Sequence, residues 1–215
     1  MSADAISRSA RPGVPAPPPR RLHRRDWRET EFAALDFETT GLDRARDAIV
    51  SFGVVPVRGG RVVLGESVHQ LVVPDVPSSP GSMKVHRILP RDLDIAPSLE
   101  VARELLHRSL ERRFLLTWYA EVEVAFLERI FGGRRRSWVR RTIDTRRLAI
   151  ELERKDPDVR ESLSSAAERY GVPVASPHEA LDDALVTAQL FLVLASKLEA
   201  RGLRSARALA RLTRA

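Results

Sequence analysis

The chain has 215 residues, of which 43% are hydrophobic and none is cysteine. This length and composition predict one folded domain with a sizeable core, and they exclude disulfide bonds, thiolate zinc sites and cysteine nucleophiles. No apolar run reaches the roughly 18 residues that a membrane span requires. The first 28 residues also lack the apolar stretch of a secretory signal, so we expect a cytoplasmic protein with no membrane contact.

The net charge of +7 is concentrated at the two ends of the chain. Residues 1–30 hold seven arginines against three acids, and residues 199–215 hold five arginines against one. We expect a disordered Pro/Arg-rich arm over 1–30, a folded domain over 31–200 and a basic tail over 201–215 that either forms a short helix or frays. Arginine tails favour encounters with phosphate backbones. Tails that are simply solvated are the alternative.

Three consecutive strands are predicted at the start of the domain, over residues 32–35, 48–58 and 61–73. The first is a short apolar run that ends at a carboxylate, as in a buried strand. Gly59-Gly60 is a hairpin signal between the second and the third. Prolines from Pro74 to Pro80 then mark a loop.

The hydrophobic period changes after this loop. We expect helices over residues 98–113, 122–131, 144–153, 162–170 and 179–200, and strands over 114–118 and 137–143. Ser98 and Asp144 are candidate N-caps. A three-strand start followed by alternating helices and strands predicts a mixed α/β sheet with helices on its faces.

The first candidate site follows the first strand, in the run DFETTG at residues 36–41. Residues two apart in a strand point to the same face, so the carboxylates of Asp36 and Glu38 project together. They repel each other unless a cation lies between them, and Mg²⁺ and Mn²⁺ prefer such hard oxygen ligands. Gly41 lets the backbone turn sharply and approach a ligand. The run therefore predicts a divalent-metal site.

The second candidate site is HEALDD at residues 178–183, where the last helix begins. Residues five apart on an α-helix are about 140° out of line. His178 and Asp183 can share a site only if His178 lies in the loop before the helix, which Pro177 favours. Asp183 would then be a fixed ligand and His178 a mobile base. Taken alone, the run is a weak signal and is more typical of a surface histidine before a helix.

Together the two runs resemble the first and third motifs, D-x-E-x-T-G and H-x-A-x-x-D, of the DnaQ-like (DEDDh) 3′→5′ exonucleases, the family of the DNA polymerase III epsilon exonuclease domain. The resemblance covers residues 32–200 and implies an RNase H-like fold with an antiparallel three-strand start. It also implies hydrolysis of the terminal phosphodiester with two divalent cations, Mg²⁺ or Mn²⁺, held by four acids. On this resemblance Asp36, Glu38 and Asp183 are metal ligands and His178 activates water.

The second motif of that family, H-N-A-x-F-D-x-x-F-L, corresponds to residues 118–127. Three residues match it: Ala120, Phe126 and Leu127. Trp118 and Tyr119 replace His-Asn, and Glu123 replaces the metal-binding Asp. Glu123 keeps the charge with a longer reach, so we take it as the fourth ligand, an ordinary helix-surface acid being the alternative. Glu121 is a substitute candidate, although residues two apart on a helix point to different sides.

Several further residues are expected near the substrate or between the motifs. Asp144, which resembles a family segment between the second and third motifs, is interpreted as a helix N-cap rather than a ligand. His86 matches a family loop near the substrate, and a solvated loop histidine is the alternative. Thr39 and Gly41 are expected against the terminal nucleotide, where small residues let the backbone come close. For Trp118, partial burial at a strand end is favoured over stacking on a base.

The substrate implied by the resemblance is the 3′ end of single-stranded nucleic acid, with little sequence preference because phosphates and metals hold the strand. DNA is the expected substrate, RNA or short oligonucleotides are the alternative, and a DNA polymerase is the candidate protein partner. A different class of function is also open: a nucleic-acid-binding module whose catalysis is weakened or lost through Glu123 and the missing His-Asn pair.

Overall fold

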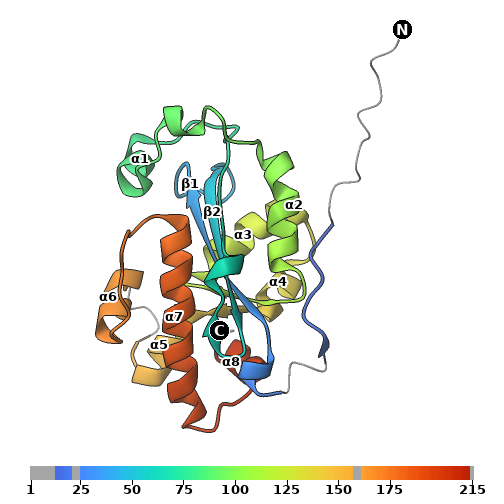
Figure 1. Cartoon of the computed structure of the whole chain (residues 1–215), viewed down its shortest axis with the longest axis vertical. Coiled ribbons are helices and arrows are strands. Elements are labelled where there is room, and N and C mark those ends of the chain that lie inside the picture. The colour runs from blue at the N-terminus through green and yellow to red at the C-terminus, as the bar shows by residue number, and fades with distance from the viewer. Residues whose placement is uncertain (1–12, 21–24, 157–160, 214–215) are drawn as a thin grey trace.

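The computed structural model describes residues 13–20, 25–156 and 161–213. Within these ranges a six-stranded sheet runs through the middle of the molecule, with helices on both of its faces (Figure 1). Five strands follow the order β3-β2-β1-β5-β6, and β4 pairs with β2. This architecture is the mixed α/β sheet that the sequence predicts.

The sheet begins with antiparallel neighbours and continues with parallel ones. The strands are β1 (Phe32–Thr39), β2 (Ile49–Arg58), β3 (Arg61–Val62), β4 (Val68–Leu71), β5 (Phe114–Thr117) and β6 (Thr142–Asp144). β2 pairs antiparallel with β1, β3 and β4, whereas β5 and β6 extend the sheet in parallel with β1. The continuous strand predicted over 61–73 is wrong, because a 3-10 helix at Leu64–Glu66 divides it around Gly65, a residue that weakens strands.

Most of the helices are those that the sequence predicts. These are α2 (Leu99–Leu110), α3 (Ala120–Phe131), α5 (Thr145–Glu153), α6 (Leu163–Arg169) and α7 (Ala180–Glu199). None of the helices in the described part of the chain is both long enough and apolar enough to cross a membrane.

Two helices are not predicted from the sequence. α1 (Pro80–His86) lies in the expected loop, where Ser79 caps it and Pro80 occupies its first turn. α4 (Arg135–Arg141) replaces most of the strand expected over 137–143. The reason is tertiary: Trp138 is 1% exposed, and its Nε1 donates to the Gly132 carbonyl at 2.9 Å, which a helix permits.

The two faces of β1 contact different hydrophobic layers. Phe32 and Ala34 pack in the cluster formed with α5, α6, α7 and α8, whereas Ala33 and Leu35 pack against α2, α3 and α4. Because side chains alternate along a strand, the residues that continue the α7 face toward the end of β1 are Asp36 and Glu38. The fold therefore turns both acids toward the helix that carries Asp183.

The chain ends pack more closely on the domain than the predicted boundaries at residues 30 and 201 imply. Trp27 is 1% exposed, meets the Phe191 ring edge-on at 5.8 Å, and donates its backbone N–H to the Arg204 carbonyl at 2.8 Å. α8 (Ala206–Leu212) buries Leu209 completely, so the helical alternative for the tail is correct. The apolar residues in both segments cover the core at this end. Residues 1–12, 21–24 and 214–215 of the expected arm and tail lie outside the described ranges.

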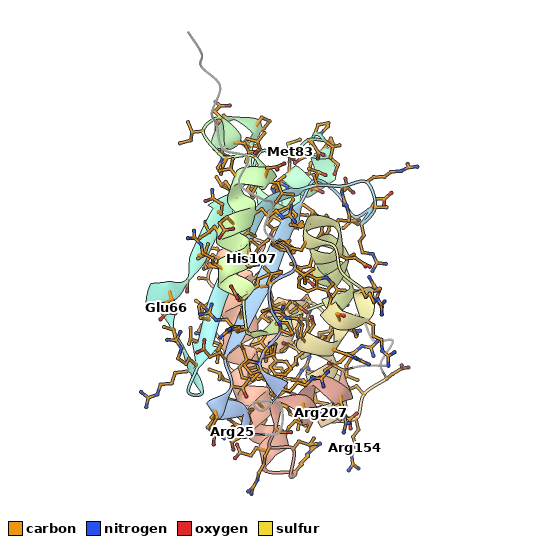
Figure 2. The ribbon with its side chains drawn as sticks, turned by 90° about the vertical axis from the view of Figure 1, so that its right-hand side faces the viewer. Arg25, Glu66, Met83, His107, Arg154 and Arg207 are labelled. Atoms are coloured by element: carbon orange, nitrogen blue, oxygen red, sulfur yellow. The ribbon has the colours of Figure 1, made fainter. Side chains whose placement is uncertain are left out.

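Two arginines of the described terminal segments, Arg25 and Arg207, lie far from the first turn of α7. Arg25 and Arg207 are at one end of the molecule and Met83 of α1 is at the other (Figure 2). α7 starts on the side of α1 and runs toward the end of the molecule where α8 lies (Figure 1), and its 20 residues span about 30 Å. Arg25 and Arg207 can therefore contact a nucleic acid only well away from the start of α7.

Trp27→Ala should lower the free energy of unfolding by about 3–5 kcal/mol, because it opens a large cavity beneath α7. Urea unfolding followed by circular dichroism measures the change. Arg25→Ala is the matched control from the same segment, since the Arg25 side chain is 59% exposed and its loss should change stability by no more than about 0.5 kcal/mol. Equal stabilities of the two variants would show that residues 25–30 are not part of the folded core.

Candidate active site

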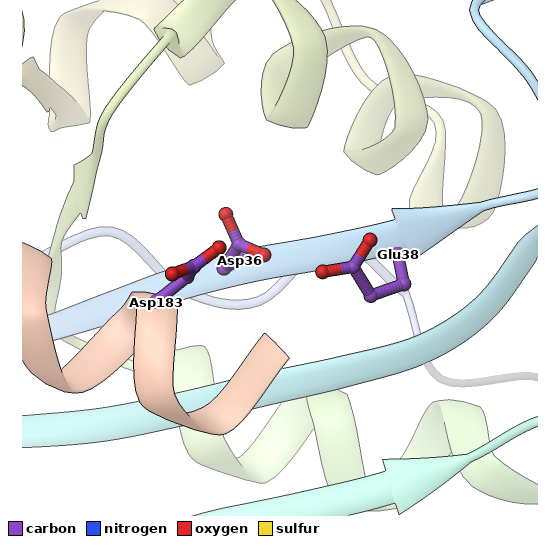
Figure 3. A group of neighbouring side chains, drawn as sticks. All are labelled: Asp36, Glu38 and Asp183. Carbon is purple, nitrogen blue, oxygen red and sulfur yellow. The ribbon is translucent and has the colours of Figure 1, made fainter. Parts of the chain in front are cut away.

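Three carboxylates from distant parts of the chain meet beside β1. The candidate ligand atoms of Asp36, Glu38 and Asp183 all lie within 4.8 Å of one another (Figure 3). Asp36 and Glu38 come from β1, and Asp183 comes from the first turn of α7. Glu38 is 8% exposed, and the two aspartates are half-buried. The structure thus brings together the three acids that the two sequence motifs single out.

Gly53 explains how α7 comes close enough to place Asp183 there. It pairs with Asp36 across β1 and β2. A Cβ atom at Gly53 would lie 2.2 Å from the Ala180 carbonyl oxygen and 2.5 Å from the Leu181 Cα, so only glycine lets the first turn of α7 rest on β2. The sequence analysis misses this residue. Its only signal is a glycine inside an otherwise apolar strand, which often marks close backbone approach.

Glu123 is the fourth acid of this region. It lies in the first turn of α3, is 5% exposed, and has no hydrogen-bond partner for Oε2 among the described residues. Its charge is one of the causes that raise the pKa of Asp36, so the two carboxylates are electrostatic neighbours. Glu123 is nevertheless outside the group whose ligand atoms lie within 4.8 Å. The substitute candidate Glu121 is 68% exposed, forms an ion pair with Arg44 at 3.0 Å, and does not belong to the group of Asp36, Glu38 and Asp183.

The carboxylates of the site resist ionisation together. Burial, and after it the charges of Glu123, Glu38 and Asp183, raises the pKa of Asp36 well above its usual value. Burial and the charge of Asp183 raise the pKa of Glu38 to about 8. Burial raises the pKa of Glu123 to about 8 as well, with a contribution from Asp144. A divalent cation would offset the free-energy cost of ionising these buried carboxyl groups by supplying positive charge.

His178 lies in the loop before α7, as the sequence analysis requires for a shared site. Its backbone is left-handed, with φ of 65°, and its N–H donates to Asp183 Oδ2 at 3.1 Å. The side chain is exposed, and its charge lowers the pKa of Asp183 in opposition to burial, which raises it. Asp183 therefore fixes the backbone of His178 while the imidazole stays accessible to solvent.

Thr39 and Gly41 form the turn that leaves β1. Thr39 Oγ1 donates to the Gly41 carbonyl at 2.8 Å. A Cβ atom at Gly41 would lie 2.4 Å from the carboxylate of Asp47, which accepts hydrogen bonds from Thr40 Oγ1 and the Asp43 N–H. A larger residue at position 41 would thus have to displace the Asp47 carboxylate from this turn, a consequence that the sequence does not reveal.

His86 ends helix α1 instead of lying in a solvated loop, which corrects that alternative. It is 7% exposed, and burial lowers its pKa. Nδ1 accepts the Ile88 N–H at 3.0 Å, so the ring proton of the neutral imidazole is on Nε2, which has no partner in the described part of the chain. The backbone N–H of Ser79, the N-cap of α1, donates to the Thr40 carbonyl at 2.8 Å, which ties this helix to the turn after β1.

Trp118 and Tyr119, which stand where the resembled family has His-Asn, have structural contacts. Trp118 is 6% exposed, and its Nε1 donates to the Glu161 carbonyl at 3.2 Å. The Tyr119 hydroxyl donates to the same carbonyl at 3.4 Å. The expected burial of Trp118 is confirmed. Asp144 is also a helix N-cap as predicted, since its Oδ1 accepts the Arg147 N–H at 2.9 Å.

Gly53→Ala should lower the affinity of the protein for Mn²⁺ by about tenfold or more, because the added methyl group must push the first turn of α7 and Asp183 away from β1. Isothermal titration with Mn²⁺ measures the effect. Gly65→Ala is the matched control, since a Cβ atom there meets nothing within 4 Å. Equal Mn²⁺ affinities of the two variants would contradict the role assigned to Gly53.

The raised pKa values predict a pH-dependent stability that metal removes. Carboxyl groups with a raised folded-state pKa stabilise the fold fully below about pH 4.5 and lose that contribution as the pH rises through about 8. In EDTA the urea concentration at the unfolding midpoint should therefore be lower at pH 8 than at pH 5. Mg²⁺ should raise this midpoint more at pH 8 than at pH 5. This decrease in the urea midpoint should be smaller in the double variant Glu38→Gln/Glu123→Gln than in the wild type. An equal fall in the wild type and this double variant would assign the pH dependence to other groups.

Comparison with known proteins identifies the family. The family model described as exonuclease (RNase T) matches residues 33–191. The PolC-type DNA polymerase III of Thermotoga maritima is 34% identical over 168 residues, which cover 76% of this chain and 12% of that protein. The DNA polymerase III subunit epsilon-like protein of Rhodobacter capsulatus is 32% identical over 178 residues, which cover 80% of this chain and 25% of that protein. The chain thus spans a quarter or less of the length of these relatives.

A solved structure of exonuclease X in complex with 5′ overhanging duplex DNA has the same fold, with a TM-score of 0.63 and 24% identity over 85% of this chain and 99% of that one. The sheet order and flanking helices thus confirm the RNase H-like fold implied by the sequence motifs. The family match covers most of the chain and includes all three acids that the fold brings together. The chain belongs to the exonuclease family, in agreement with its DnaQ-like motifs.

Proposed function

We propose that this chain is a metal-dependent 3′→5′ exonuclease that removes nucleotides one at a time from the 3′ end of single-stranded DNA. The observation that carries the proposal is the convergence of Asp36, Glu38 and Asp183, whose ligand atoms lie within 4.8 Å of one another. Family membership alone gives the reaction class, hydrolysis of a phosphodiester. The acid cluster supplies a place where that reaction can be catalysed.

The residues of the site fit divalent cations. All donors are carboxylate oxygens, which suit Mg²⁺ and Mn²⁺. The buried Oε2 of Glu123 has no hydrogen-bond partner among the described residues, and burial and the charge of Asp183 raise the pKa of Glu38. We assign Asp36, Glu38, Asp183 and Glu123 to two cations. Cations bound there would activate the attacking water and stabilise the charge that develops on the leaving 3′ oxygen.

His178 is the proposed general base. Its imidazole is exposed beside Asp183, where water and substrate can reach it, and its backbone is held by the Asp183 carboxylate. The imidazole accepts a proton from the attacking water as the water oxygen bonds to phosphorus and the 3′ oxygen departs. Asp183 thereby links metal binding to the placement of the base.

The turn after β1 and the end of α1 are the proposed contacts of the terminal nucleotide. The backbone of Thr39 and Gly41 continues directly from Glu38, and α1 is tied to this turn through Ser79. His86 offers a buried Nε2–H without a partner in the described chain, suited to an oxygen acceptor of the sugar or phosphate. Contacts to sugar and phosphate carry no sequence information, so this assignment predicts cleavage with little sequence preference.

The relatives support DNA rather than RNA as the substrate, because two of them are named as DNA polymerase III proteins. For the same reason a DNA polymerase stays the proposed protein partner. The match covers only 12% and 25% of those proteins, so DNA as substrate and a DNA polymerase as partner are proposals for this chain.

Degradation of 3′- and 5′-labelled single-stranded DNA and RNA, each in Mg²⁺ and in Mn²⁺, tests the proposal. From the 3′-labelled strand we expect immediate release of the label as a mononucleotide. The 5′-labelled strand should shorten progressively. Asp36→Asn should reduce the rate by about 100-fold or more, because it removes a ligand charge at the centre of the cluster. Activity should be higher in Mn²⁺, since Mg²⁺ demands stricter octahedral geometry and Glu123 is longer than the family Asp. Glu123→Asp should narrow that difference.

Tight strand binding without release of mononucleotides in either metal would reject the enzyme in favour of the nucleic-acid-binding module. Faster degradation of RNA than of DNA would keep the chemistry and change the substrate. Unaltered hydrolysis by Asp36→Asn would show that the acid cluster is not the catalytic site.

A further inference from the structure

Helix α3, which carries Glu123, has no N-terminal cap of its own. Its N-cap residue is Tyr119, whose side chain makes no capping hydrogen bond. The N–H of Ala120, the first residue of the helix, instead donates to Asp144 Oδ2 at 3.1 Å. The cap of α3 is thus supplied by a residue 24 positions later in the chain, at the end of β6.

Asp144 caps two helices with one carboxylate. Oδ1 accepts the Arg147 N–H of α5 at 2.9 Å, while Oδ2 accepts the Ala120 N–H of α3. Asp144 is 4% exposed and pairs in register with Thr117 of β5, so its own position is fixed by the sheet. A negative charge between two helix N-termini gains from both helix dipoles and from charge-assisted hydrogen bonds. The hydrogen bond from Ala120 to Asp144 therefore holds the start of α3 at the end of β6.

The position of Glu123 depends on this hydrogen bond between Ala120 and Asp144. Glu123 lies three residues after Ala120, within the same helical turn. In the described chain no residue donates a hydrogen bond to its Oε2. The position of the Glu123 carboxylate therefore depends on where this helical turn lies, and not on a hydrogen-bond donor to Oε2. The charge of Asp144 also contributes, after burial, to the raised pKa of Glu123, which shows that the two carboxylates are close.

We propose that Asp144 is a positioning residue of the metal site, which sets the place of the Glu123 carboxylate by capping α3 at Ala120. Asp144 is not itself a ligand, because each of its oxygens accepts a backbone N–H and it does not belong to the cluster of Asp36, Glu38 and Asp183. The inference rests on the proposed function, since it assigns Asp144 a role in the same catalytic site.

Asp144→Ala and Asp144→Asn test this role in the full chain. Asp144→Ala should lower the Mn²⁺ affinity and the kcat for a labelled single-stranded DNA oligonucleotide by about 10- to 100-fold, as loss of a residue that orients a metal ligand does. KM should stay within about threefold, because Asp144 does not touch the strand. Asp144→Asn has the same shape and keeps one acceptor oxygen, so it should fold if the alanine variant does not, with a smaller loss of the same kind.

Ser162→Ala and Ser205→Ala are matched controls. Each serine caps a short helix, α6 or α8, by accepting a backbone N–H, from Ser165 at 3.1 Å or Ala208 at 3.2 Å. Both variants should unfold at a lower urea concentration than the wild type, with an unchanged Mn²⁺ titration. A loss of Mn²⁺ affinity in these controls as large as in the Asp144 variants would reduce Asp144 to an ordinary cap and overturn the proposal.

A double-mutant cycle with Glu123→Ala separates positioning from a general structural role. If Asp144 acts through Glu123, adding Asp144→Ala to Glu123→Ala should change the Mn²⁺ affinity less than about twofold. An equal loss in both backgrounds would overturn the inference. Absence of hydrolysis by the wild type would overturn the proposed function alone, because the Mn²⁺ titrations still decide the role of Asp144.

Discussion

The mutual repulsion of buried carboxylates is the constraint on which the site depends. Burial raises the pKa of Asp36, Glu38, Asp183 and Glu123, and the charges of neighbouring acids within this group raise the pKa of Asp36 and of Glu38 further. No fold would place four such groups together for stability alone, because each one costs free energy when ionised without a counter-charge. The surrounding structure must therefore hold them in place, and a cation explains why they are there.

Three elements hold the acids, and each is positioned by the backbone. β1 presents Asp36 and Glu38 on one face because side chains alternate along a strand. α7 reaches that face because Gly53 has no side chain to keep the Ala180 carbonyl away. α3 starts where it does because Asp144 accepts the N–H of its first residue. Backbone contacts thus fix the site at three points, while the carboxylate side chains stay available for ligands.

The two hydrophobic layers make this arrangement rigid. The cluster beneath α7 includes residues of β1, β5, α5, α6 and α8, and the cluster on the other face joins the sheet to α2, α3 and α4. Trp27 and Leu209 extend the first cluster into segments that look like charged tails in the sequence. α7 is packed along its whole length, so the position of Asp183 near its start is determined by burial of residues such as Phe191 two turns further on.

The sequence by itself determined the order of most elements and the identity of the acids, because alternation in strands and the spacing of DFETTG and HEALDD are local properties of the chain. Helix α4, the interrupted strand at residues 61–73 and the burial of Trp27 depend on contacts between distant segments, which no local period records. The same holds within the site, where the motifs name Asp36 and Asp183 but not the residues that position them. Gly53 approaches Ala180, which is 127 positions later in the chain. Asp144 caps α3 at Ala120, which is 24 positions earlier. Such close approaches exist only after the sheet and its helices have packed, so only the tertiary structure could decide them.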